Sequence, residues 1–123
     1  MAVRFFTRNE VSPDYYKRSI TGCSNGGVFV LTASKKLSHL FGSYLPFSFG
    51  ANIESYQWSA NPKPKFYMAV GKYEPSFLEQ INNWASILKK EVIDYQLNIL
   101  PAGHDSQMWT MELIAYLKEL YGL

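Results

Sequence analysis

The chain has 123 residues, 47% of them hydrophobic, and its 12 basic and 10 acidic residues leave a formal net charge of +2 at pH 7. This length supports one buried core and is too short for two, so we expect a single domain over residues 1–123. The charged residues form no long run of one sign, which argues against nucleic acid or an anionic membrane as a partner.

The single cysteine, Cys23, cannot form a disulfide within the chain and says nothing about the compartment. No stretch reaches the length of a membrane span, and residues 1–6 are too short and too soon charged for a signal peptide. If Met1 is the native start, we therefore expect a cytoplasmic protein.

The first expected strand covers residues 18–21 and runs into Gly-Cys-Ser-Asn-Gly at residues 22–26. The pattern Gly-x-Ser-x-Gly is typical of a sharp strand-to-helix turn that presents a nucleophilic serine in a strained backbone conformation. The positions two before and two after the serine must lack side chains so that strand and helix can approach closely, and both are glycine, at residues 22 and 26. Apolar residues over 27–36 then favour a buried helix.

An aromatic strand is expected over residues 43–50, although Pro46 within it lacks a donor for the ladder. A loop region follows over residues 51–64, with a short helix near residues 53–57. Residues 65–71 are apolar on both faces, as a central parallel strand requires.

Ser76 is expected to cap a helix that runs to Lys90, with apolar residues spaced three and four apart. A fourth strand over residues 94–100, a loop over 101–105 and a helix over 107–121 complete the chain. This alternation predicts the α/β class, with a parallel sheet of about four strands and flanking helices.

Function in a parallel sheet lies beyond the carboxyl ends of its strands. Ser24, Glu74 and His104 follow the first, third and fourth expected strands, so all three are expected on the same rim. The order Ser, acid, His is the one associated with α/β-hydrolases.

A serine hydroxyl becomes a useful nucleophile when a neutral imidazole takes its proton and a carboxylate orients that imidazole. We therefore assign Ser24 as nucleophile, His104 as general base and then acid, and Glu74 as orienting acid. The backbone N–H of Asn25, at the start of the following helix, is expected to donate to the developing oxyanion.

Four motifs along the chain belong together. They are, in order, Arg18-Ser19-Ile20-Thr21-Gly22-Cys23-Ser24-Asn25-Gly26-Gly27, Leu40-Phe41-Gly42, Lys65-Phe66-Tyr67 with Gly71-Lys72-Tyr73-Glu74-Pro75-Ser76-Phe77-Leu78, and Gly103-His104-Asp105 with Trp109. By these motifs the chain resembles the C-terminal half of the enterochelin-esterase-like group of esterases. The resemblance implies a partial α/β-hydrolase fold, hydrolysis of a small-molecule carboxylic ester through Ser24, His104 and Glu74, and no metal or organic cofactor.

An intact member of that group has several strands before the nucleophile turn, and they carry the second oxyanion donor. The sequence before Ser24 contains no counterpart of them, so the first strand is expected at an unprotected sheet edge. The rival prediction is a truncated, catalytically idle half-domain that forms a homodimer or pairs with a partner chain. Self-association is the expectation that separates the two.

Several assignments stay open at this point. Glu54, after the second strand, competes with Glu74 for the role of orienting acid. Trp58 and Trp109 are expected near the rim, where they are candidates for lining an acyl or aromatic pocket, but a role in the core or in a lid remains the default for both. Asp105 is better placed to begin the last helix than to act as a catalytic acid.

Overall fold

The computed structural model describes residues 14–51, 58 and 63–123. Its elements are, in chain order, the 3-10 helix η1 (Tyr15–Lys17), β1 (Ser19–Cys23), α1 (Asn25–Lys36), β2 (Ser43–Phe47), β3 (Lys65–Gly71), α2 (Pro75–Lys90), β4 (Tyr95–Leu100) and α3 (Ser106–Tyr121). The predicted α/β class is therefore confirmed. No helix within the described ranges is both long and apolar enough to cross a membrane.

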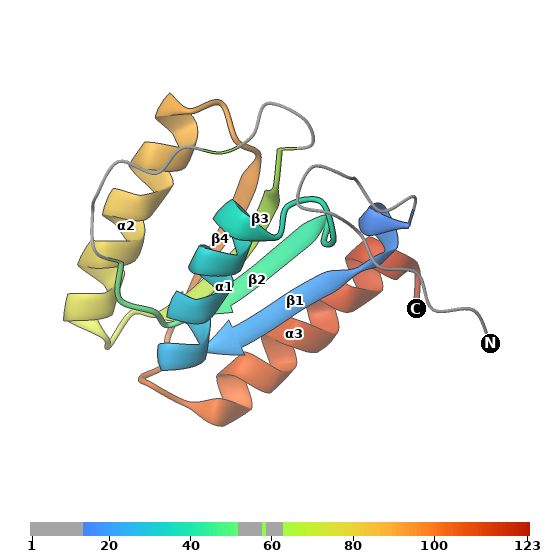
Figure 1. Ribbon diagram of the computed structural model, residues 1–123. Helices are drawn as coiled ribbons and strands as arrows, with labels where there is room; N and C mark the ends of the chain where they lie inside the picture. Colours follow the sequence, from blue (N-terminus) through green and yellow to red (C-terminus); the bar gives the residue numbers. More distant parts are fainter. Residues whose placement is uncertain (1–13, 52–57, 59–62) are drawn as a thin grey trace.

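The four strands form one parallel sheet, as predicted, and they lie in the order β1-β2-β3-β4. Helices α1 and α2 lie on one face of this sheet and α3 lies on the other (Figure 1). Because all strands run the same way, the residues that follow them meet at one end of the sheet, which we term the carboxyl end. The opposite end is termed the amino end.

Each face of the sheet has its own core. The larger core, under α1 and α2, includes Val30, Leu31, Tyr44, Phe66, Met68, Val70, Ile81, Trp84 and Leu88. The smaller core, under α3, contains Leu45, Phe47, Ala69, Met108 and Tyr116. Successive side chains of a strand point to opposite faces, so β2 and β3 supply residues to both cores, and β2 is buried along its whole length.

Several element boundaries differ from the sequence prediction, most of them by one or two residues, and the differences in β2 and α2 have a clear physical reason. Strand β2 ends at Phe47 and not at residue 50, because Ser48 has a φ of 45° and leaves the extended conformation. Helix α2 begins at Pro75, so the cap position belongs to Glu74 and not to Ser76. Proline suits the first helical position, since its fixed φ is helical and its nitrogen needs no acceptor. The expected helix at residues 53–57 lies outside the described residues.

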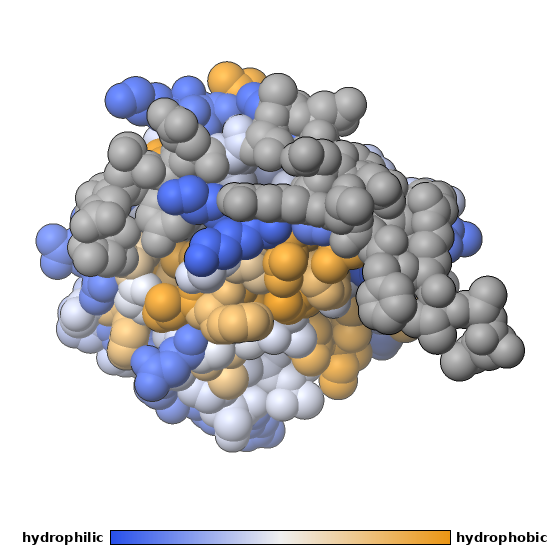
Figure 2. Space-filling view, viewed as in Figure 1, coloured by the Kyte–Doolittle hydropathy of each residue, from blue (hydrophilic) through white to orange (hydrophobic). Residues whose placement is uncertain are grey.

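Strands β1 and β4 form the two edges of the described sheet, so the expected edge position of the first strand is confirmed there. Next to β1, α1 exposes 41% of Val28 and 63% of Phe29. Figure 2 shows apolar side chains gathered over the part of this face where α1 and β1 lie. Among the described residues, an apolar surface therefore lies beside the edge strand β1.

Candidate active site

The turn between β1 and α1 holds Ser24 at a φ of 55° and a ψ of −123°. A non-glycine residue in such a conformation costs of order 1–3 kcal/mol, and such strain is concentrated at functional sites. A Cβ on Gly22 would lie only 2.4 Å from the carbonyl oxygen of Gly26. Strand and helix therefore nearly touch at Gly22, and a larger residue would separate them.

The other glycines of this turn differ from the prediction. A Cβ on Gly26 would have no described atom within 4 Å, so this position does not need glycine for space. A Cβ on Gly27 would lie 2.8 Å from the Cβ of Phe49. The second close approach of the turn therefore occurs at Gly27, against the segment after β2, and the role assigned to Gly26 was wrong.

Backbone hydrogen bonds around Ser24 leave the first amide of α1 available. The N–H of Ser24 donates to the carbonyl of Phe47 over 3.0 Å, and the carbonyl of Ser24 accepts from the N–H of Gly27 over 3.0 Å. Among the described residues, no hydrogen bond uses the N–H of Asn25, which lies at the positive end of the helix dipole. This amide can donate to an anion formed at Ser24.

Glu74 and His104 are in direct contact, although 30 positions separate them in the chain. The Nδ1 atom of His104 lies against Oε1 of Glu74, and it donates, because an ionised carboxylate can only accept. Glu74 is 5% exposed, and its Oε2 accepts from the N–H of Gly71 over 2.7 Å and from Oγ of Ser48 over 2.8 Å. Both oxygens of this buried carboxylate therefore have partners.

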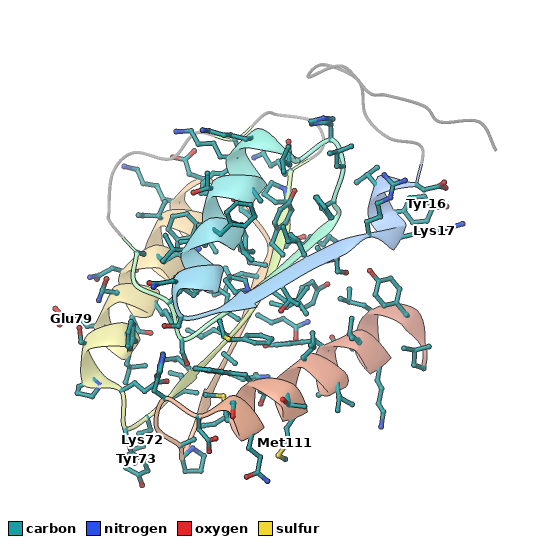
Figure 3. The ribbon with its side chains drawn as sticks, turned by 60° about the horizontal axis from the view of Figure 1, so that its bottom comes forward. Tyr16, Lys17, Lys72, Tyr73, Glu79 and Met111 are labelled. Carbon is teal, nitrogen blue, oxygen red and sulfur yellow. The ribbon has the colours of Figure 1, made fainter. Side chains whose placement is uncertain are left out.

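The loops that carry Glu74 and His104 touch along their backbones. A Cβ on Gly71 would lie 2.1 Å from the carbonyl oxygen of Ala102, and that oxygen accepts from the N–H of Tyr73 over 3.0 Å. The side chain of Tyr73 extends outward from this loop (Figure 3) and is 67% exposed, whereas Glu74 turns inward. Gly71 thus permits the crossing that brings acid and imidazole together.

Two aromatic rings enclose the imidazole of His104. Phe77 stacks on it with centroids 5.0 Å apart, and Trp109 meets it edge-on at 4.6 Å. The His104 side chain remains 38% exposed, and with Nδ1 engaged by Glu74, Nε2 is the nitrogen left for proton exchange. Within the described part of the chain, no hydrogen bond joins Oγ of Ser24 to His104.

The two tryptophans expected near the rim occupy different places. Trp109, in α3, lies against the imidazole and donates its Nε1–H to Oγ of Ser48 over 2.8 Å. Trp58 donates to Oγ of Ser34, in the last part of α1, over 3.1 Å and packs its ring against the larger core. The rim prediction was wrong for Trp58, because its ring joins an aromatic cluster at the amino end.

The remaining acidic candidates are also placed. Oδ1 of Asp105 accepts from the N–H of Gln107 over 2.9 Å and caps α3, as predicted. Glu54 lies outside the described residues, and Glu74 is the carboxylate that contacts His104. In the described ranges, no group of three or more His, Cys, Asp or Glu side chains is arranged to hold a metal ion.

An apolar cavity of about 240 Å³ lies between β1 and α3, beside the Ser24 turn. Its lining is formed by Thr21, Gly22, Cys23, Phe47, Ser106, Trp109, Thr110 and Leu113. A cavity lined mainly by apolar atoms suits an apolar part of a ligand.

Sequence reasoning assigned neither Ser48 nor Phe77 to this site. The signal that could have found Ser48 is a lone polar residue between two phenylalanines at the carboxyl end of a strand. Phe77 carries no such signal, because a phenylalanine in the first turn of an amphipathic helix is expected to pack on the sheet.

No protein-family model matches the chain, and no curated protein matches it. Solved structures do match. The enterobactin esterase of Shigella flexneri, solved in the presence of enterobactin, superposes with a TM-score of 0.72 and 20% identity over 90% of this chain and 32% of its own. The ferric enterobactin esterase of Salmonella typhimurium gives a TM-score of 0.74 and 18% identity over 89% of this chain and 31% of its own.

The fluorophosphonate-binding serine hydrolase F of Staphylococcus aureus matches with a TM-score of 0.71 and 15% identity, over 89% of this chain and 56% of its own. The chain spans about a third of the length of the enterobactin esterases that it matches. At these identities the likeness concerns the fold. The described residues therefore form part of an α/β-hydrolase fold, of the kind found in esterases, as the sequence resemblance implied.

Proposed function

We propose that the chain carries the catalytic residues of a serine hydrolase that cleaves carboxylic esters, with Ser24 as nucleophile, His104 as general base and acid, and Glu74 as orienting acid. The observation that carries the proposal is the contact between the buried Glu74 carboxylate and Nδ1 of His104, at the same end of the sheet as the strained Ser24. A carboxylate on Nδ1 selects the tautomer whose Nε2 can accept a proton.

In the acylation step, Nε2 of His104 takes the proton of the Ser24 hydroxyl as Oγ attacks the ester carbonyl carbon. The tetrahedral intermediate collapses, and the alcohol leaves with the proton held by His104. Water then gives a proton to His104 and attacks the acyl carbon. Oγ of Ser24 leaves, recovers that proton, and releases the carboxylic acid, so that ester and water give acid and alcohol.

The N–H of Asn25 supports the same proposal, since it begins α1 and has no acceptor among the described residues. A fixed amide there stabilises the developing oxyanion without reorganisation. Such oxyanions are held by two donors in α/β-hydrolases, and we propose that the second donor is not in this chain.

A small-molecule ester is the proposed substrate. Support comes from the likeness to enterobactin esterases, one of which was solved in the presence of enterobactin. The apolar cavity lined by Cys23, Phe47 and Trp109 suits the apolar part of an acyl group or alcohol. The steps above require no cofactor.

The test is fluorophosphonate labelling followed by intact-mass measurement, which requires no knowledge of the substrate. We expect stoichiometric labelling of the wild-type chain and none of Ser24→Ala or His104→Ala. Ser86→Ala and His39→Ala are matched controls, because Ser86 is exposed on α2 and His39 lies in the turn after α1. A folded wild-type chain that takes no label, or a label that survives Ser24→Ala, contradicts the proposal.

A second candidate function is an idle half-domain that pairs with its own copy or with a partner chain. It is favoured by the edge position of β1 in the described sheet, beside exposed Val28 and Phe29. Edge strands and adjacent apolar patches are templates for association. Size-exclusion chromatography with light scattering at micromolar concentration should then show a dimer that takes no label, and a monomer would exclude self-association.

A further inference from the structure

Ser48 is an unusual residue for its position. Its exposed fraction is 0%, and it is one of three non-glycine residues in the described part of the chain with a positive φ. That backbone conformation disfavours a serine, and a buried hydroxyl is unfavourable unless it is hydrogen-bonded. The side chain must therefore have a role that offsets both penalties.

The hydroxyl of Ser48 connects two side chains. Its Oγ lies 2.8 Å from Nε1 of Trp109 and 2.8 Å from Oε2 of Glu74. An indole N–H can only donate and an ionised carboxylate can only accept, so the direction of both bonds is determined. Trp109 donates to Ser48, and Ser48 donates to Glu74.

Two contacts of His104, one with Glu74 and one with Trp109, link it to both ends of this hydrogen-bonded chain. Oε1 of Glu74 contacts Nδ1 of His104, and the indole of Trp109 lies edge-on to the imidazole at 4.6 Å. The four residues come from the end of β2, the loop after β3, the loop after β4, and α3. Contacts from several elements therefore restrain the imidazole together.

We propose that Ser48 and Trp109 are positioning residues, which hold the Glu74 carboxylate in the orientation that faces His104. The inference rests on the proposed function for its catalytic meaning. Without the Ser48 hydroxyl, Oε2 of Glu74 keeps, among its described partners, only the N–H of Gly71, so the carboxylate can rotate away from the imidazole.

Two variants test the proposal. Ser48→Gly removes the hydroxyl and suits the positive φ, and Trp109→Phe keeps a ring beside His104 but removes the indole N–H. The chain offers matched controls in Ser34→Ala and Trp58→Phe, because Trp58 donates to the fully buried Ser34 in the larger core.

Two measurements are made on folded protein: the downfield proton resonance of the His104 Nδ1–H, and the rate of fluorophosphonate labelling as a function of pH. We expect Ser48→Gly and Trp109→Phe to weaken the resonance and to slow labelling by about 10- to 100-fold, as small misplacements of a catalytic group do. The pH profile is expected to shift in both, because the imidazole loses its fixed acceptor. The two controls should retain the wild-type resonance, rate and profile.

Folded Ser48→Gly and Trp109→Phe that both keep the wild-type resonance and rate overturn the proposal, and so does a wild-type chain without the resonance. If one variant does not fold, the other decides. A wild-type chain that shows the resonance but takes no label defeats the proposed function alone. The resonance in the two variants then still decides whether these residues position His104.

Discussion

The two ends of the sheet contain the same hydrogen-bonded pair in different surroundings. At the carboxyl end, buried Ser48 accepts from Trp109 and donates to the carboxylate of Glu74. At the amino end, buried Ser34 accepts from Trp58 and donates to a backbone carbonyl over 2.6 Å. In the first pair the serine donates to an ionisable group, and in the second it donates to a carbonyl of its own helix.

What differs between the two pairs is the final acceptor and its neighbours. Glu74 contacts the half-exposed His104, whereas Trp58 lies among the rings of Phe66 and Trp84. Under our proposal, the tryptophan–serine bond at the carboxyl end holds a carboxylate against an imidazole, whereas the bond at the amino end belongs to the packing of the larger core. Changes at the carboxyl end should therefore affect reactivity more than stability, and changes at the amino end should do the reverse.

The largest effect is expected for Glu74→Gln, which tests the carboxyl end directly. The amide cannot replace the anionic acceptor on Nδ1 of His104, and a comparable change in serine proteases lowers the rate about 10,000-fold. We expect a similar loss in the rate of fluorophosphonate labelling, with the protein still folded. Glu79→Gln, on the exposed side of α2 (Figure 3), is the matched control. Labelling by Glu74→Gln at the wild-type rate would break the comparison.

Trp84→Ala tests the opposite end of the comparison. Trp84 has an exposed fraction of 0% and packs 5.8 Å from the ring of Phe66, so its removal leaves a large cavity. We expect the free energy of unfolding to fall by about 3–5 kcal/mol in urea titrations. The labelling rate of the folded fraction should stay at the wild-type value. A rate that falls in proportion to stability would show that the two ends are not independent.

A pair of glycine substitutions sharpens the comparison within the Ser24 turn. Gly22→Ala places a Cβ against the backbone of Gly26 and is expected to cost about 1–3 kcal/mol of stability, as overpacking does. Gly26→Ala meets open space at the start of α1 and is expected to stabilise the helix by up to about 1 kcal/mol. Chemical denaturation of both variants measures the difference in their free energies of unfolding. Equal destabilisation would mean that the close approach at Gly22 is not what the turn requires.

The smallest effect is expected for the change of the free energy of unfolding with pH, which is small near neutrality and appears at alkaline pH. It concerns one buried tyrosine on each face of the sheet. Burial raises the pKa of Tyr44 and of Tyr116, and nearby Glu112 adds to the shift at Tyr116. Since these phenols ionise more easily when unfolded, their stabilisation is complete below the unfolded value of about 10 and is lost above it.

The loss should reach up to about 1.4 kcal/mol per pH unit for each phenol above that value. Between pH 9 and about 11, the free energy of unfolding from denaturant titrations should therefore fall less steeply with pH in Tyr44→Phe and in Tyr116→Phe than in the wild-type chain. Tyr73→Phe serves as the control, because Tyr73 is 67% exposed. Slopes that do not change in either buried variant would contradict this expectation.

The fold could be predicted because its signals are local. The apolar run over residues 65–71 became β3 with the same bounds, and the spacing of apolar residues predicted α2 to within two residues of its start. The parallel direction of the strands then followed from the alternation of strands and helices along the chain. The largest boundary error, at the end of β2, depends on the backbone conformation of Ser48, which a hydroxyl among aromatic residues does not predict.

For the candidate site, chain order alone led to Ser24, Glu74 and His104 at one end of the sheet, since parallel strands carry their following residues to the same end. Strand register and the paths of the loops then determined which side chains touch. The contact of Glu74 with His104 joins positions 30 apart, and that of Ser48 with Trp109 joins positions 61 apart. Such distant pairs, like the packing of Trp58 at the amino end, arise only when the elements assemble, because no local pattern encodes the distance between them.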